Sequence, residues 1–341
     1  MERSRRPTSA DVAARAGVTR ATVSYILSGS AQHSFPDATR EKVLRAAQDL
    51  GYTPHAAARA LRRGTSGVVL LVLADVPIGV NLGALIAATT TAVAATGRSL
   101  VTWTAGAGPA LRDTLAHVDP VVVLTLAPLP DDDRAAVASI GVPLVAVPNG
   151  LAAGADDGGF SRGEVAVGGL QLGRLAAAGH RRVAVVSVRD RRLQVFARGR
   201  AEGVRRAALD LGLDAPVEVA LGEPDEAAIA EVAALLPGWL RAGVTACACY
   251  NDQYAGVVVA AARRAGAAVP AALSVVGVDD EPMGAFLDPP LTTVRYDFRD
   301  AAGYVVRQVA AVVDGAPPPG PPSSLSVALV ERGSVGPAPV R

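Results

Sequence analysis

Long apolar runs that alternate with alanine-rich stretches dominate this 341-residue chain from Gly67 onward. Strands that are apolar on both faces are typical of parallel sheets covered by helices on both sides. The expected strands are Val68–Leu73, Leu100–Thr104, Val121–Thr125, Leu144–Val147, Val183–Ser187, Val217–Ala220, Ala246–Tyr250 and Ser274–Val278. The expected helices lie around residues 81–96, 131–139, 163–178, 198–211, 225–236, 252–265 and 299–314. Two such sets, dividing near residues 148–162, predict two doubly wound α/β lobes with a cleft between them.

Residues 8–28 carry a different pattern, which predicts two short helices joined by a glycine turn at Gly17. Thr8 and Asp11 have the spacing of a capping box, and Thr19 can cap the second helix. The inward positions would be Val12, Ala13, Ala16, Val23, Ile26 and Leu27, and the outward positions of the second helix Arg20, Ala21, Ser24 and Tyr25. A third helix is expected from about Asp37 to Leu50, with Val43, Leu44, Ala47 and Leu50 at helical spacing. This all-α segment is typical of a helix-turn-helix, whose second helix lies in a DNA groove.

Basic residues gather in the first 66 positions. Eleven lysine or arginine residues stand there against five acidic residues, a net charge of +6, while the remaining 22 basic and 27 acidic residues give −5. A basic headpiece on an acidic body is typical of a nucleic-acid module attached to a domain of another kind. The alternative is a small helical bundle whose arginines only solvate it, but charge and motif together favour DNA binding.

The stretch after the third helix predicts a further short helix. Pro54 can begin it, the alanine run that follows favours helix, and Gly64 can end it. A helix of about ten residues is marginal alone, so it should form only with a partner. Leu61 stands among arginines and suits a wedge inserted into the minor groove. The alternative for this segment is an ordinary charged linker.

Composition limits the class of protein. Half of the residues are apolar, which is enough for a headpiece and two lobes with cores of their own. Because no apolar run reaches the length of a membrane span and the basic N-terminus lacks a signal-peptide core, the chain is expected in the cytoplasm. Cys247 and Cys249 should share one face of a strand as reduced core thiols. Neither a metal site nor a cofactor motif is expected.

Several motifs resemble those of one family, the lactose-repressor (LacI/GalR) family of transcription regulators. They are Thr8-x-x-Asp11-Val12-Ala13-x-x-Ala16-Gly17-Val18-Thr19-x-x-Thr22-Val23-Ser24, Thr39-Arg40-Glu41-Lys42-Val43, Gly51-Tyr52-x-Pro54 and the run from Ala56 to Leu61. The resemblance implies a helix-turn-helix headpiece at 1–53, a hinge helix and linker at 54–66, and a two-lobed body at 67–341. That body would be similar to type I periplasmic binding proteins, with lobe 1 at about 67–161 and 293–320 and lobe 2 at about 162–292 and 321–341.

The resemblance also implies a function. The chain would be a repressor that binds a pseudo-palindromic operator as a homodimer, under the control of a small polar ligand such as a sugar, polyol or nucleoside. Arg20, Ala21 and Tyr25 would meet base edges, although Tyr25 departs from the arginine common there. The full set of expected DNA-contacting residues is Thr8, Ser9, Thr19, Arg20, Ala21, Thr22, Ser24, Tyr25, Ala58 and Leu61. Two hinge helices would form on DNA and pry open the central step with paired Leu61 side chains.

Four residues are expected to bind the effector in the cleft: Arg200, Asn251, Asp279 and Phe298. Arg200 belongs to a family-like Arg-x-x-Gly motif, and Asp279 follows an expected strand at the carboxyl edge where open sheets bind ligands. An arginine and an aspartate across one cleft suit a neutral polyhydroxylated ligand. The alternative is a buried structural ion pair. His180, in the Gly-His-Arg-Arg turn, is expected to be structural.

Three departures from the family pattern concern the pocket. The loop at residues 74–82 lacks the usual aromatic pair, Gly163 or Glu164 stands where an aspartate is common, and the stretch between Trp103 and Val121 is short. The pocket is therefore expected to be reshaped on its first-lobe side. Phe160, Phe196 and Phe298 could offer stacking surface, although such residues are more often core.

Two other function classes stay open. One is a small-molecule binding protein with a vestigial headpiece. The other is a hydrolase, because Gly159-Phe160-Ser161-Arg162-Gly163 matches the nucleophile elbow, although that motif needs a preceding strand and residues 149–158 read as a loop. Asp131, Asp132 and Asp133 are expected to begin a helix rather than to bind a metal. No catalytic residue is expected.

Overall fold

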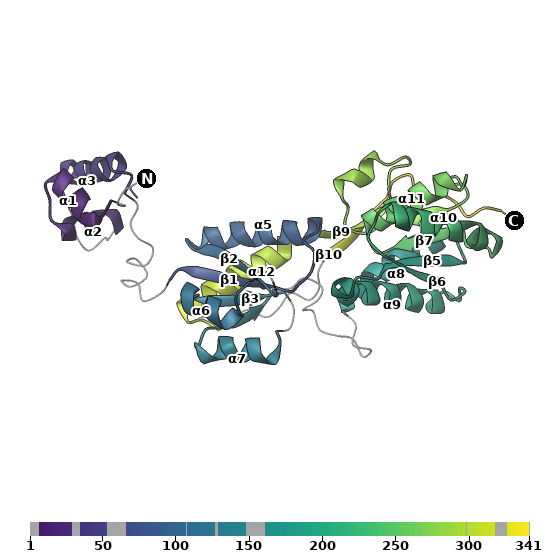
Figure 1. The fold of residues 1–341 in the computed structure, drawn as a ribbon, viewed down its shortest axis with the longest axis horizontal. Helices are drawn as coiled ribbons and strands as arrows, with labels where there is room; N and C mark the ends of the chain where they lie inside the picture. The colour runs from purple at the N-terminus through teal and green to yellow at the C-terminus, as the bar shows by residue number, and fades with distance from the viewer. Residues whose placement is uncertain are drawn as a thin grey trace. The chain divides into compact units, whose positions relative to one another are not determined.

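The structure, a computed structural model, describes residues 7–28, 35–52, 66–106, 108–126, 129–147, 161–297, 299–317 and 326–340. They belong to two compact units, Met1–Gly67 and Val68–Arg341 (Figure 1). Each unit has its own hydrophobic core. The expected residues Ala58, Leu61, Phe160 and Phe298, and the expected hinge helix, lie outside the described part of the chain.

The first unit contains the helices α1 (Ser9–Ala16), α2 (Arg20–Ser28) and α3 (Asp37–Asp49). The expected capping box forms, since the Thr8 hydroxyl accepts from the Asp11 amide and the Thr8 amide donates to Asp11 Oδ2 at 2.7 Å. Gly17 ends α1 at φ 67°, and Thr19 Oγ1 accepts from the Thr22 amide. The core includes Val12, Ala13, Val23, Ile26, Val43, Ala46 and Ala47. One expectation was wrong: Leu44 is 48 % exposed, because Ala46 and not Leu44 completes the face that Val43 and Ala47 begin.

In the second unit, the first lobe is built on a four-stranded parallel sheet in the order β2-β1-β3-β4. Its strands are β1 (Val68–Leu73), β2 (Ser99–Thr104), β3 (Val122–Thr125) and β4 (Leu144–Ala146). Its helices are α5 (Val80–Ala95), α6 (Leu111–Val118), α7 (Asp131–Ser139) and α12 (Arg299–Asp314). Alternate residues of β1 face opposite sides, so Val69 and Leu71 pack with α5 and α12 while Leu70 and Val72 pack with α6 and α7 (Figure 1).

The second lobe is built on a parallel sheet in the order β6-β5-β7-β8. Its strands are β5 (Val183–Val188), β6 (Val217–Leu221), β7 (Ala246–Cys249) and β8 (Ser274–Val276). Its helices are α8 (Arg162–Ala177), α9 (Gln194–Asp210), α10 (Glu226–Arg241) and α11 (Asp252–Arg264), with short 3-10 turns η1 (Arg191–Leu193) and η2 (Pro282–Phe286). The helices α10 and α11 cover one face of this sheet, and α8 and α9 cover the other.

Two strands that the sequence analysis did not predict join the lobes. β9 (Thr293–Asp297) and β10 (Ser326–Val330) pair antiparallel, and Val294 and Tyr296 of β9 pack with Val167 of α8. Beyond β9 the chain returns to the first lobe, where Tyr304, Val305 and Val309 of α12 enter its core. α6 was also missed, because its eight residues fall in a stretch without a long apolar run.

Several other expectations about the lobes are confirmed in the described part of the chain. The eight expected strands and seven expected helices are all present among the described residues, with ends that shift by a few residues. His180 is fully buried, with its ring nitrogens against Thr245 Oγ1 at 2.8 Å and Ser274 Oγ at 2.9 Å, and burial lowers its pKa. Cys247 and Cys249 are free and buried in one core, and the aspartates at 131–133 begin α7. No helix in the described part of the chain has the length and apolar character needed to span a membrane.

Candidate effector cavity and nucleic-acid interface

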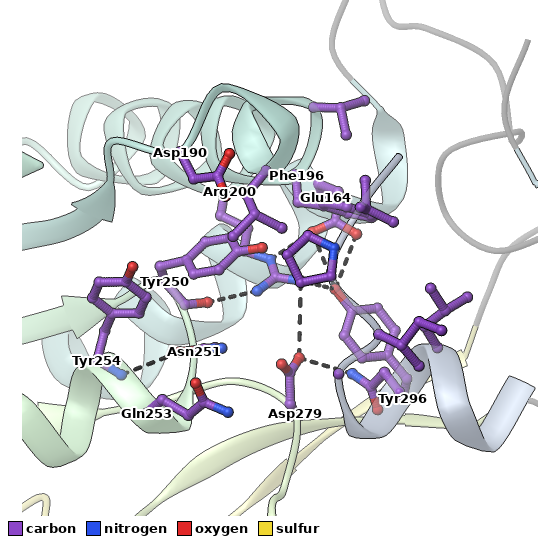
Figure 2. Close-up of a pocket in the computed structure, with 18 of the residues that line it drawn as sticks. Glu164, Asp190, Phe196, Arg200, Tyr250, Asn251, Gln253, Tyr254, Asp279 and Tyr296 are labelled. Carbon is purple, nitrogen blue, oxygen red and sulfur yellow. Dashed lines mark hydrogen bonds and ion pairs between the residues drawn. The ribbon is translucent and has the colours of Figure 1, made fainter. Parts of the chain in front are cut away.

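A cavity of about 280 Å³ lies between residues of the two lobes (Figure 2). Its first-lobe wall consists of Leu73, Ala74, Val76, Pro77, Ile78, Gly79, Asn81, Leu82, Leu85 and Leu126. Its second-lobe wall consists of Glu164, Asp190, Leu193, Val195, Phe196, Arg200, Glu223, Pro224, Tyr250, Asn251, Gln253, Tyr254, Asp279, Glu281 and Tyr296. The two walls differ in chemistry, since one is almost wholly apolar and the other carries charges, amides and aromatic rings.

Glycines bring the two helices of the second-lobe wall into backbone contact. A Cβ on Gly168 of α8 would overlap the Arg200 carbonyl oxygen, and a Cβ on Gly203 of α9 would overlap the Val165 carbonyl oxygen. A Cβ on Gly199 would lie 2.6 Å from Cβ of Glu164. Only residues without side chains permit this close approach. The consequence is that Glu164 and Arg200, on neighbouring helices, face one another at the wall of the cavity.

Arg200 is almost completely buried and all three of its guanidinium nitrogens have partners. Nε donates to Glu164 Oε2 at 2.6 Å, Nη1 to the Tyr250 carbonyl oxygen at 2.5 Å and Nη2 to the Tyr296 hydroxyl at 3.1 Å. The guanidinium also lies 4.8 Å from the centre of the Tyr250 ring. Burial opposes its charge, but the neighbouring carboxylate of Glu164 raises the Arg200 pKa, so the group stays ionised. Figure 2 shows this network above Asp279.

Asp279 projects from the end of β8, in a backbone conformation that side chains rarely adopt, with φ 107°. Strained backbone of this kind is found where the fold must fix a functional group. Asp279 Oδ1 accepts from Nδ2 of Asn81, from the first lobe, at 2.8 Å, and lies 3.9 Å from Nη2 of Arg200. Burial raises the pKa of Asp279 to about 6, although the Arg200 charge acts in the opposite direction.

Asp252 holds the loop that carries Asp279. It is fully buried at the start of α11, where Oδ1 accepts from the Thr293 hydroxyl at 2.6 Å and Oδ2 from the Glu281 amide at 2.7 Å. Gly277 leaves the room for this carboxylate, because a Cβ there would overlap Asp252 Oδ1. Burial raises the Asp252 pKa to about 7. Asp252 is therefore a positioning residue and does not line the cavity.

The structure brings three of the four expected effector residues together. Arg200, Asn251 and Asp279 line one cavity, and Asn251 also caps α11 by accepting from the Tyr254 amide at 3.1 Å. Sequence reasoning missed Asn81, Tyr250 and Tyr296 as cavity residues. Tyr250 could have been found, since it ends an expected strand directly before Asn251, whereas nothing local marks Asn81 or Tyr296. Glu164, noted only as a departure, is the partner of Arg200.

Arg200 lines the cavity and is also half of a buried ion pair with Glu164. Phe196 likewise lines the cavity while packing against the second-lobe core. The expected loss of aromatic residues from the first-lobe loop agrees with the lining, in which no described first-lobe residue is aromatic.

The residues of the headpiece that are expected to contact DNA differ in exposure. Arg20, Ala21 and Tyr25 of α2 are exposed, as is Thr19 before it, and the Tyr25 ring stacks on Phe35 with centres 6.4 Å apart. The other expected contact residues, Thr8, Ser9, Thr22 and Ser24, are half-buried at helix starts or along α2.

Ser161 has a local role in the structure. Its hydroxyl caps α8 by accepting from the Glu164 amide at 3.5 Å. The residues before it in the elbow-like motif lie outside the described part of the chain. A search of the described residues finds no group of three or more histidine, cysteine or acidic side chains placed to bind a metal ion.

Comparisons with known proteins cover both units. Residues 8–55 match the bacterial regulatory proteins of the lacI family, and residues 172–335 match the periplasmic binding protein-like domain. The chain is 30 % identical to the HTH-type transcriptional regulator GalR of Escherichia coli K12, over 95 % of this chain and 94 % of GalR. It is 32 % identical to the HTH-type transcriptional regulator MalR of Streptomyces coelicolor, over 97 % of each.

Two solved structures of transcriptional regulators have a similar fold. A lac repressor dimer bound to operator and the anti-inducer ONPF has a TM-score of 0.76 at 24 % identity, covering 97 % of this chain and 100 % of the repressor. A complex of the transcriptional regulator CelR with cellobiose has a TM-score of 0.64 at 26 % identity, covering 96 % of this chain and 100 % of CelR.

Proposed function

Because the chain belongs to the LacI family of bacterial regulatory proteins, and is a DNA-binding transcriptional regulator, we propose that it is a ligand-controlled repressor. It binds a pseudo-palindromic operator as a homodimer. Its place in the cell is the cytoplasm, which contains the bacterial chromosome. The observation that carries the proposal is the exposed face of α2, with Arg20, Ala21 and Tyr25 on a capped helix-turn-helix. A lac repressor dimer bound to operator, which shares this fold, supports the dimeric arrangement.

The exposed residues of α2 contact the edges of the DNA bases and thereby set the sequence preference. Arg20 can donate two hydrogen bonds to a guanine, an interaction worth about 1–3 kcal/mol of discrimination. Thr8, Ser9, Thr19, Thr22 and Ser24 lie at helix starts or on the flank of α2, where hydroxyls suit phosphates. In the hinge segment, paired Leu61 side chains open the minor groove, and Ala58 is a further DNA-contacting residue.

The effector is a small hydroxylated molecule held in the interlobe cavity by Arg200, Asn251 and Asp279. The CelR complex with cellobiose supports a sugar-like ligand at this type of site. Binding changes the relative angle of the lobes and thereby the spacing of the hinge segments. A coupling of about 1–3 kcal/mol, typical of allosteric proteins, changes operator affinity by about 5- to 150-fold. Ser161 has no catalytic part in this function, and its hydroxyl caps α8.

Selection of duplexes from a random pool, at physiological ionic strength, tests the DNA part. We expect enrichment of an inverted repeat, and Arg20→Ala should relax the preference at one position in each half-site. Arg45→Ala, which removes the same charge from α3, is the matched control and should weaken all duplexes equally. No preference among duplexes would overturn the proposal and favour a ligand-binding protein with a vestigial headpiece.

The ligand part needs a separate measurement. A thermal-shift screen of sugars, polyols and nucleosides should identify stabilising ligands, because a ligand at about 100 times its Kd adds about 2.7 kcal/mol. Asp279→Ala should abolish the effect of such a ligand on operator binding while leaving the operator affinity itself unchanged. A variant that responds at the wild-type ligand concentration would remove Asp279 from the effector site.

A further inference from the structure

The cavity carries an excess of negative charge. The ionisable side chains that line it are five carboxylates and a single arginine, among the described residues: Glu164, Asp190, Glu223, Asp279, Glu281 and Arg200. If Arg200 and Asp279 both faced the ligand with their charges free, the expected effector would be a neutral sugar. That expectation changes here, because Glu164 already neutralises Arg200 at 2.6 Å.

The contacts of the other four carboxylates do not remove this excess of negative charge. Asp190 is paired with Arg192 outside the cavity wall, at 2.6 Å. Oδ1 of Asp279 lies 3.9 Å from Nη2 of Arg200. That nitrogen donates a hydrogen bond to the Tyr296 hydroxyl. Glu281 is buried and accepts from the neutral Gln253 amide at 3.1 Å, and the described residues place no cation within ion-pair distance of Glu281 or Glu223. Glu164 and Asp279 share the single positive charge of Arg200, and Glu223 and Glu281 have no cation within ion-pair distance among the described residues, so the wall keeps a net negative charge.

Several hydrogen-bond donors of the cavity are already engaged with protein acceptors. All three Arg200 nitrogens donate to protein acceptors. The amide of Asn81 donates to Asp279, the amide of Gln253 donates to Glu281, and the Tyr254 hydroxyl donates to the Gly222 carbonyl oxygen at 2.7 Å. Carboxylates accept up to four hydrogen bonds and donate none. The amide nitrogen of Asn251 can still donate to a ligand, but the carboxylates give this wall many acceptors, so it suits a ligand that brings donors of its own.

Aromatic rings and the first-lobe wall form the rest of the cavity lining. Tyr250 and Tyr254 lie edge to face with ring centres 5.8 Å apart, and they line the cavity together with Phe196. The Tyr250 ring already contacts the Arg200 guanidinium, so Tyr254 and Phe196 are the rings left to stabilise an organic cation. The first-lobe wall is apolar apart from Asn81. A volume of about 280 Å³ admits a molecule about the size of a monosaccharide.

We propose that the effector is a hydroxylated organic amine, protonated at neutral pH, whose ammonium group lies among Asp279, Glu281 and Glu223 while its apolar face meets the first-lobe wall. This inference rests on the proposed function, since it specifies the ligand of that cavity. Burial raises the pKa of Asp279 to about 6 even though the Arg200 charge lowers it, so this carboxyl group would gain from a second positive charge nearby.

Matched pairs of ligands test the charge directly. Titration calorimetry on the full-length protein compares D-glucosamine with D-glucose, D-galactosamine with D-galactose and D-mannosamine with D-mannose. At least one amine should bind ten-fold or more tightly than its neutral partner, and its affinity should fall as salt is raised. Equal or tighter binding of the neutral member in every pair, or binding by none of the three amines, overturns the proposal.

Variants locate the effect. Glu281→Gln and Glu223→Gln keep the size of each side chain and remove one charge, so together they should reduce the amine preference to three-fold or less. Glu218→Gln, an acidic residue of β6 outside the cavity, is the control and should leave the preference unchanged. A preference that survives both cavity variants overturns the assignment of the ammonium site.

Operator binding is measured in the same samples. Duplex selectivity without amine preference contradicts only this inference, whereas loss of duplex selectivity in the wild type contradicts the proposed function itself.

Discussion

The two walls of the cavity are built in different ways. The second-lobe wall stands on buried partners: Glu164 and Arg200 meet across glycine-tight helices, and Asp279 is fixed by a strained turn. The first-lobe wall is a loop and the start of α5, where Ile78 is 63 % exposed and Asn81 donates to Asp279 of the second lobe. A single substitution in a wall that depends on buried charges should cost more stability than a substitution in an exposed apolar loop.

The two walls therefore contribute to ligand binding in different ways. The second lobe supplies hydrogen bonds and charge in a geometry that exists before ligand arrives, which reduces the cost of binding. The first lobe supplies apolar area, whose contribution follows size and shape and little else. Changes of ligand preference should therefore be gained most easily at residues 76–82.

The largest expected effect comes from breaking the buried pair. Arg200→Ala leaves the Glu164 carboxylate buried without its cation, so the free energy of unfolding should fall by about 3–5 kcal/mol. Urea denaturation of the full-length protein, followed by circular dichroism, measures the change. Glu164→Met combined with Arg200→Met removes both charges and should recover much of the loss. A loss below about 1 kcal/mol in the single variant would show that the second-lobe wall is not held by this pair.

The next effect is a pH dependence that the second-lobe wall should impose. The Asp279 pKa is about 6 in the folded protein against an ordinary value of 3.8, so the folded state keeps a proton that the unfolded chain loses. The free energy of unfolding should therefore fall as pH rises from about 4 to about 6, by about 3 kcal/mol, and be flat with respect to this group above.

Asp279→Asn should remove that portion of the fall. It should retain the portion due to Asp252, which extends to about pH 7 for the same reason. Denaturation at a series of pH values provides the measurement, with Asp132→Asn on α7 as a control for the loss of one charge. An unaltered profile in Asp279→Asn would assign the pH dependence to other groups.

A smaller effect tests the packing beneath the second-lobe wall. Gly203→Ala forces α8 and α9 apart and should lower the free energy of unfolding by about 1–3 kcal/mol, while weakening ligand binding through displacement of Arg200. Gly173→Ala on the exposed side of α8, where a Cβ meets nothing within 4 Å, should instead be neutral or stabilising. Equal effects in the two variants would contradict the role of close helix contact.

The smallest effect on stability is expected in the first-lobe wall. Ile78→Asn should change the free energy of unfolding by less than about 0.5 kcal/mol, because the side chain is exposed. Affinity for a ligand that buries it should fall about five-fold, which corresponds to about 1 kcal/mol of lost apolar contact. Val80→Asn, which lies outside the cavity lining, is the matched control for calorimetry. If both variants bind alike, the first lobe does not set specificity.

The two walls were also unequally predictable. Arg200, Asn251 and Asp279 follow from motifs and from the rule that ligands bind at the carboxyl edge of parallel strands. Glu164 has no local pattern that marks it as the partner of Arg200, and the contact depends on how closely α8 and α9 approach. Asn81 and Asp279 are 198 positions apart, so their hydrogen bond exists only once both lobes have folded.

The sequence by itself determined the headpiece, the alternation of strands and helices, and the family, since capping residues, apolar periodicity and charge act over a few neighbouring positions. The tertiary structure alone decided which ionisable groups face the cavity with a counterion and which without. That distinction depends on distances of a few ångströms between residues far apart in the chain. Electrostatic energy in a buried site changes steeply over such distances.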